Sequence, residues 1–251
     1  MSGPQPRPPR SATPFGPPLR GVDVLRAILL GIALFVAAIL AVRQMLPDNA
    51  STGARINVLI GSFAAWTFAW LAAIWLVFVR GRGLSFAALG YTVPERRWAL
   101  IGVGAGFGAL PLALLAAALL RPALGSDSAP DLQQYFGSGA DFTIFHAMAM
   151  LLYGGFLVPL TEELLFRGLL FRWLRQRLNF WPAALASAAL FGVAHGTADK
   201  AVIAGLLGLP LAWLFERSRS LAPAILLHQT YNSLALMLTF AALWLPEAAP
   251  G

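Results

Sequence analysis

Residues 56–79 read INVLIGSFAAWTFAWLAAIWLVFV, and this stretch contains no Asp, Glu, Lys or Arg. An α-helix needs about 20 predominantly apolar residues to cross the hydrocarbon core of a bilayer. The stretches 98–120 and 221–246 are equally free of these charged residues. The sequence therefore predicts a protein that crosses a membrane several times as helices.

The composition of the whole chain supports this prediction. Of the 251 residues, 58% are hydrophobic and 12% are charged, whereas soluble domains average about 45–50% and 25%. The net charge of +7 comes from basic residues beside apolar segments, which indicates orientation in a membrane rather than nucleic-acid binding. We expect membrane lipids as partners and no nucleic acid. The absence of cysteine excludes thiol nucleophiles, disulfides and thiolate metal sites.

The predicted fold class is all-α, a polytopic transmembrane helical bundle with seven spans. Unpaired backbone groups are costly in lipid, and continuous apolar runs do not fit the strands of a barrel. The expected spans are 27–42, 56–79, 98–120, 142–160, 180–198, 201–215 and 221–245.

Two domains follow from this pattern. Residues 1–23 hold seven prolines and several arginines, so we expect a disordered, Pro/Arg-rich cytoplasmic tail that forms neither helix nor core. Residues 24–251 form the transmembrane helical domain.

The basic residues predict how the helices are oriented. If the N-terminus is cytoplasmic and the loops alternate, 14 of the 18 basic residues lie on the cytoplasmic side. This agrees with the positive-inside rule. We expect an integral, multi-pass protein of the bacterial cell membrane with a cytoplasmic N-terminus. The cluster Arg172, Arg175 and Arg177 would attract anionic lipid headgroups.

The segment 142–177 is too long for one simple span. Its 36 residues would measure about 54 Å as a straight helix, against a hydrocarbon core of about 30 Å. We expect it to bend or to extend beyond the core, with Gly154, Gly155 and Pro159 as candidate break points. Splitting the segment there gives eight spans as the alternative.

A small set of polar residues lies within these apolar segments, where ionisable side chains are costly and by default indicate function. Glu163 and Arg167 are spaced i and i+4, which favours an ion pair that supports the helix. Glu162 has no such partner, so its carboxylate is available for chemistry. The remaining members of the set are His195, His228 and Asn232.

Simple geometry places Glu162 and His195 at the same depth. If the chain turns near Asn179, both residues lie about 25 Å from the turn along antiparallel helices. His228 and Asn232 are also spaced i and i+4 and share one helical face. Carboxylates, imidazoles and an amide in an apolar bundle are the ingredients of a hydrolase that activates enclosed water. The alternative from the residues alone is a buried hydrogen-bond network that only fixes packing.

These residues resemble the motifs of the CPBP family of intramembrane proteases, which includes the CAAX prenyl endopeptidases of the Rce type and the Abi proteins associated with bacteriocin immunity. The matching motifs are Glu-Glu-x-x-x-Arg at 162–167, Phe-x-x-x-His at 191–195 and His-x-x-x-Asn at 228–232. The resemblance implies a CPBP-like catalytic core at about 142–245.

The resemblance also implies roles for the site residues. Glu162 with His195 would activate a water that attacks a peptide carbonyl, while His228 and Asn232 stabilise the oxyanion. The family has been described as metalloproteases too, with Glu162, His195 and His228 as candidate zinc ligands here. The sequence has no His-Glu-x-x-His motif, and the residues suit either scheme.

The expected function is an intramembrane endopeptidase, glutamate-dependent or metal-dependent. Its expected substrate is a membrane-anchored or hydrophobic peptide, with a prenylated CAAX-like substrate as a narrower option. The alternative is a non-catalytic membrane protein of the same scaffold that acts by binding, as in bacteriocin self-immunity. A proton-coupled transporter would use the same buried acids and histidines, but the sequence shows no inverted repeat to support it.

Overall fold

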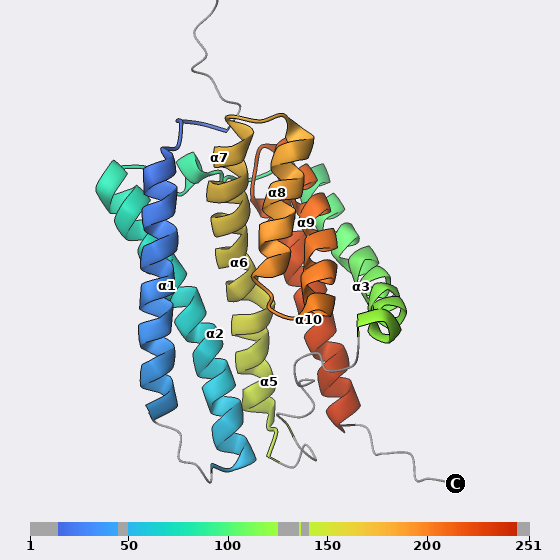
Figure 1. Ribbon diagram of the computed structural model, residues 1–251. Coiled ribbons are helices and arrows are strands. Elements are labelled where there is room, and N and C mark those ends of the chain that lie inside the picture. The colour runs from blue at the N-terminus through green and yellow to red at the C-terminus, as the bar shows by residue number, and fades with distance from the viewer. Residues whose placement is uncertain (1–14, 45–49, 125–135, 137–140, 245–251) are drawn as a thin grey trace, which may run out of the picture.

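The computed structural model describes residues 15–44, 50–124, 136 and 141–244, and for 121–124 it describes the backbone alone. Within these ranges the chain forms seven helical segments and no strand (Figure 1). The first three are α1 (Gly21–Gln44), α2 (Thr52–Ile74), which continues as a π-helical turn at Trp75–Arg80, and α3 (Arg96–Leu124). The fourth runs from α5 (Ile144–Met150) through α6 (Val158–Glu163) to α7 (Arg172–Arg175). The last three are α8 (Phe180–Val193), α9 (Ala198–Ser218) and α10 (Ala222–Trp244).

The prediction of a helical membrane bundle is confirmed. Five of the seven segments are long and apolar enough to cross a membrane. The two others differ for physical reasons: α8 has 14 residues and measures about 21 Å, and α10 carries the polar run His-Gln-Thr-Tyr-Asn-Ser at 228–233. α10 carries His228 and Asn232 of the predicted site, and His195 lies in the turn that follows α8.

The distribution of side chains is inverted relative to a soluble protein. Large apolar side chains such as Leu112, Leu119 and Val193 are exposed on the outer surface, whereas Glu163, Arg167 and His228 are buried. In water such a surface would be an aggregation hazard, but it fits a hydrocarbon solvent. The polar groups are therefore enclosed by the bundle.

The long segment 144–175 is a single continuous helix at the centre of the bundle (Figure 1). Its expected break points do not interrupt it. Gly154 and Gly155 lie in a π-helical stretch, Leu151–Leu157, and a second one, Leu164–Phe171, follows α6. The structure thus has seven helices rather than the eight of the alternative, and at 32 residues this helix extends beyond a 30 Å core, as its length requires.

The helices α8 and α9 form a hairpin whose tip lies partway along the central helix (Figure 1). α8 ends at Val193, five residues earlier than the predicted span 180–198. Gly196 has a φ of +86° and allows the tight turn. A Cβ at Gly192 would lie 2.3 Å from the Ala201 carbonyl oxygen, so this glycine allows the two helices to approach closely.

The prediction of a disordered tail over residues 1–23 is wrong for its last part, while residues 1–14 lie outside the described residues. Residues 15–20, here called the N-terminal strap, pack against the end of the bundle, and α1 begins at Gly21. Phe15 and Leu19 are buried in the main core. The buried Arg172 guanidinium donates hydrogen bonds to the carbonyl oxygens of Pro17 and Ala88. The prolines prevent a helix but leave carbonyls and apolar side chains that bind the bundle in an extended form.

Candidate active site

Glu162 and Glu163 end α6, a short stretch of α-helix between the two π-helical stretches. Glu162 is 8% exposed and Glu163 is fully buried. π-helical turns within α-helices are frequent at functional sites. Here they flank both acidic residues of the first predicted motif.

The ion pair predicted between Glu163 and Arg167 is present. The Arg167 guanidinium donates a hydrogen bond to Glu163 Oε1 over 2.8 Å, and both side chains are fully buried. Arg167 also donates to the Gly208 carbonyl oxygen over 3.3 Å and lies 4.4 Å from the centre of the Phe191 ring. A Cβ at Gly208 would lie 2.8 Å from Ala188 Cβ. Arg167 therefore links the central helix to α8 and α9, and it belongs to the interior rather than to the cytoplasmic basic residues.

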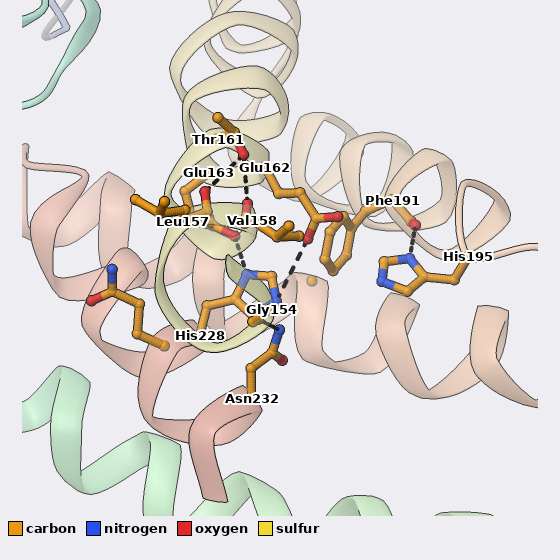
Figure 2. A network of polar contacts seen from close by, with 12 residues as sticks. Gly154, Leu157, Val158, Thr161, Glu162, Glu163, Phe191, His195, His228 and Asn232 are labelled. Atoms are coloured by element: carbon orange, nitrogen blue, oxygen red, sulfur yellow. Dashed lines mark hydrogen bonds and ion pairs between the residues drawn. The ribbon is translucent and has the colours of Figure 1, made fainter. Parts of the chain in front are cut away.

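His228 joins the two glutamates from α10. Its Nδ1 lies 2.9 Å from Glu163 Oε1, and its Nε2 lies 3.7 Å from Glu162 Oε2 (Figure 2). A carboxylate oxygen accepts, so Nδ1 carries a proton and donates to Glu163. The i,i+4 spacing predicted only Arg167 as a partner of Glu163. His228 lies 65 residues away in the chain, and local spacing in the sequence cannot predict such a contact.

His195 lies in the turn after α8 and is oriented by its own helix. Its Nδ1 donates to the Phe191 carbonyl oxygen over 2.8 Å, since a carbonyl can only accept. In the neutral imidazole Nε2 therefore carries the lone pair. Glu162 lies within electrostatic range of both His195 and His228, and Figure 2 shows the three side chains directed into one region. Glu162 and His195 therefore lie in the same part of the bundle, and their joint action on a substrate stays a prediction.

Phe191 is a residue whose role the sequence reasoning missed. It is fully buried, and its ring contacts both imidazoles edge-on, with centroid distances of 4.7 Å to His195 and 5.7 Å to His228. Arg167 lies on the same ring, so the Phe191 side chain packs against three polar residues of the site at once. Phe191 lies four residues before His195, and this i,i+4 spacing was the sequence feature that could have predicted the contact between the two rings.

Asn232 has a structural partner in the central helix. Its Nδ2 donates to the Gly154 carbonyl oxygen over 3.1 Å. In this π-helical stretch the Val158 N–H bonds to the Tyr153 carbonyl, so the next donor in the pattern would be residue 159. That residue is proline and has no N–H. The Asn232 amide thus supplies a missing donor, and it keeps a second N–H for other use.

The group formed by Glu162, Glu163, Arg167, His195 and His228 is here called the Glu–His cluster. When His228 carries a proton on both nitrogens and His195 is neutral, the charges of the cluster sum to zero, which suits a buried environment. The 3.7 Å contact between His228 and Glu162 is longer than a hydrogen bond. The Glu162 carboxylate therefore retains acceptor capacity, as a base acting on water requires.

The donor groups also bear on the metal question. Across the described part of the chain, no three His, Cys, Asp or Glu side chains are grouped closely enough to hold a metal ion. The predicted zinc ligands Glu162, His195 and His228 share one region but do not form such a set.

Comparison with known proteins agrees with the motifs. Residues 144–234 match the family model "Type II CAAX prenyl endopeptidase Rce1-like". The chain is also similar to "Putative membrane peptidase YdiL" of Bacillus subtilis (strain 168), with 26% identity over 89 residues. This alignment covers 36% of each protein, so the chain spans about a third of that relative's length. No solved structure matches.

The matched region includes every member of the Glu–His cluster and Asn232, on the central helix and on α8 to α10. The family model and the order of the motifs agree over these residues. The family model over residues 144–234, the similar peptidase and the motif order support a CPBP-family assignment.

Proposed function

We propose that this chain is an intramembrane endopeptidase that hydrolyses a peptide bond in a membrane-anchored or hydrophobic substrate. The observation that carries the proposal is the convergence of the Glu162 carboxylate with His195 and His228, each held by a hydrogen bond from its Nδ1. The matched family model and the similar Bacillus subtilis protein are both named as peptidases. This favours catalysis over the non-catalytic alternative, bacteriocin self-immunity by binding.

In the proposed reaction, Glu162 accepts a proton from a water molecule that His195 Nε2 orients. The resulting hydroxide attacks the peptide carbonyl carbon. The oxyanion accepts hydrogen bonds from His228 Nε2–H, when His228 is protonated, and from the free N–H of Asn232. Glu162 then gives its proton to the leaving nitrogen as the C–N bond breaks, which restores the carboxylate.

Glu163 and Arg167 are positioning residues in this scheme. Glu163 accepts the Nδ1 proton of His228 and so turns Nε2 toward Glu162, while Arg167 neutralises Glu163. The location within a bundle with an apolar outer surface favours a substrate that arrives through the membrane. We include a farnesylated CAAX peptide among the substrates to be tested, since the matched family model is named for such endopeptidases.

The first test is cleavage by purified protein in detergent. Glu162→Gln keeps the shape of the side chain but removes the base, and we expect cleavage to fall about 10²–10⁴-fold with an unchanged thermal unfolding midpoint. Glu95→Gln is the matched control, because Glu95 is an exposed glutamate at a helix start and should leave the rate unchanged. Full activity of Glu162→Gln would refute the assignment.

A chelator decides whether zinc takes part. Loss of cleavage with a chelator and its return with Zn²⁺ would favour the metal scheme, with Glu162, His195 and His228 as the proposed ligands. Unchanged cleavage would favour activation of water by Glu162 alone.

His146 lies outside the cluster and bonds to Thr143, so His146→Gln serves as the imidazole control for His195→Gln.

A further inference from the structure

A pocket of about 420 Å³ opens at the end of the bundle where α8 begins and α9 ends. In Figure 1 this is the end that also carries α7 and the start of α1. The pocket is separate from the Glu–His cluster, because none of the residues that line the pocket belongs to the cluster. The lining residues are Phe180, Trp181, Trp213, Glu216, Arg217 and Arg219.

The charge of this pocket is positive. Its single acidic lining residue, Glu216, is neutralised by Arg175, whose Nε and Nη2 each donate a hydrogen bond over 3.2 Å. Arg219 lies 3.9 Å from the same carboxylate. Arg217 is exposed, and within the described ranges no ion pair or hydrogen bond engages its side chain. Within the described ranges the Arg217 guanidinium is thus free of ion pairs and hydrogen bonds, and the Arg219 guanidinium is only weakly paired with Glu216.

The aromatic side chains place the pocket at a membrane interface. Trp181 at the start of α8 is 65% exposed. Trp213 is 40% exposed and lies in the last turns of α9, a helix long and apolar enough to span a membrane. Trp213 also packs edge-on against Trp98, with 5.8 Å between ring centroids. Tryptophan is enriched at the headgroup level of bilayers, where its ring contacts both chains and headgroups. A ligand there would meet apolar rings and guanidinium groups together.

Arg219 has a backbone conformation that favours glycine. Its φ is 59° at the C-terminal cap of α9, and among the described residues it is the only non-glycine residue with a positive φ. Its guanidinium lies 4.7 Å from the centre of the Phe15 ring in the N-terminal strap. Glycine would suit this cap better, so the arginine is retained at the expense of backbone strain, which points to a use for its side chain.

We propose that this pocket binds the headgroup of an anionic phospholipid. The phosphate would accept hydrogen bonds from Arg217 and Arg219, because guanidinium groups match phosphate oxygens in pairs. The glycerol and upper chain region would lie against Trp181 and Trp213. A free phosphate would use the guanidinium groups but gain nothing from the exposed rings. The pocket lies at the base of the α8–α9 hairpin, so a bound lipid would anchor the hairpin whose tip carries His195.

Native mass spectrometry of the full-length protein, released from detergent, can measure the dissociation constant of the first bound lipid. The probes are dioleoylphosphatidylglycerol, dioleoylphosphatidylcholine and inorganic phosphate. We expect Arg217→Gln and Arg219→Gly each to weaken phosphatidylglycerol binding about fivefold. Arg219→Gly relieves the left-handed backbone, so its thermal unfolding midpoint shows that any loss of lipid is not a loss of fold. Arg177→Gln is the matched control, since Arg177 is at the same end of the bundle but is not among the residues that line the pocket.

Support requires that phosphatidylglycerol binds more tightly than phosphatidylcholine and that only the two pocket variants weaken it. Equal weakening by Arg177→Gln would overturn the proposal, because diffuse surface charge would then explain the binding. Equal affinity for phosphatidylcholine would also overturn it. Inorganic phosphate that binds as tightly as the lipid would assign the site to a free anion instead.

Discussion

At the scale of single residues, Glu163 Oε1 is the most heavily used atom of the cluster, because Arg167 and His228 both donate to it. Removing one member of a buried ion pair leaves an uncompensated charge and costs about 3–5 kcal/mol. We expect Glu163→Gln and Arg167→Met each to lower the thermal unfolding midpoint in detergent. The double variant should lose less stability than the sum of the two, with a coupling of about 0.5–3 kcal/mol.

The same variants separate positioning from stability. Glu163→Gln should also reduce turnover of a cleaved peptide, since the His228 ring loses its anionic acceptor. Strict additivity of the two single changes in unfolding would show that the buried pair does not act as a unit.

At the scale of elements, the glycines at 102, 104, 106 and 108 distinguish the two faces of α3. A Cβ at Gly106 would lie 2.5 Å from Thr230 Cβ, whereas a Cβ at Gly104 would meet nothing within 4 Å. We expect Gly106→Ala to destabilise the packing of α3 on α10 by about 1–3 kcal/mol. Gly104→Ala should be neutral or stabilising, because alanine favours a helix over glycine. Thermal unfolding of the two variants side by side tests this, and equal effects would contradict it.

The sequence predicted the elements better than their ends and contacts. Apolar runs located the seven helices, because hydrocarbon leaves the backbone few choices. The last turn of the predicted span 180–198 is wrong, since α8 ends at Val193 and the chain turns at Gly196, whose φ is positive. At the site, the i,i+4 rule found the pair Glu163–Arg167, but the contacts to Gly208, Phe191 and His228 cross between helices. Local spacing carries no information about such contacts. The hydrogen bond from Asn232 to the Gly154 carbonyl oxygen depends on a π-helical stretch that the sequence pattern did not predict.

At the scale of the whole molecule, the expected orientation can be tested directly because the chain contains no cysteine. Glu95 precedes α3 and Asp141 precedes α5, at opposite ends of the bundle (Figure 1). With a cytoplasmic N-terminus, a membrane-impermeant maleimide should label Asp141→Cys in intact cells. It should label Glu95→Cys only after the membrane is permeabilised. The reverse pattern would place the N-terminus outside.

The N-terminal strap has a consequence for the order in which the molecule is completed. Its residues are synthesised before the helices of the bundle, yet the Leu19 N–H donates to Gln176 and the Pro17 carbonyl accepts from Arg172, which lie 157 and 155 positions later in the chain. Contacts of such sequence separation form late, since the intervening chain must be ordered before they can close. The N-terminal strap is therefore synthesised before the helices but is among the last segments to be placed. Until the strap docks, the guanidinium of Arg172 lacks one of its two carbonyl partners. The early synthesis of the strap therefore does not make this end of the protein fold early.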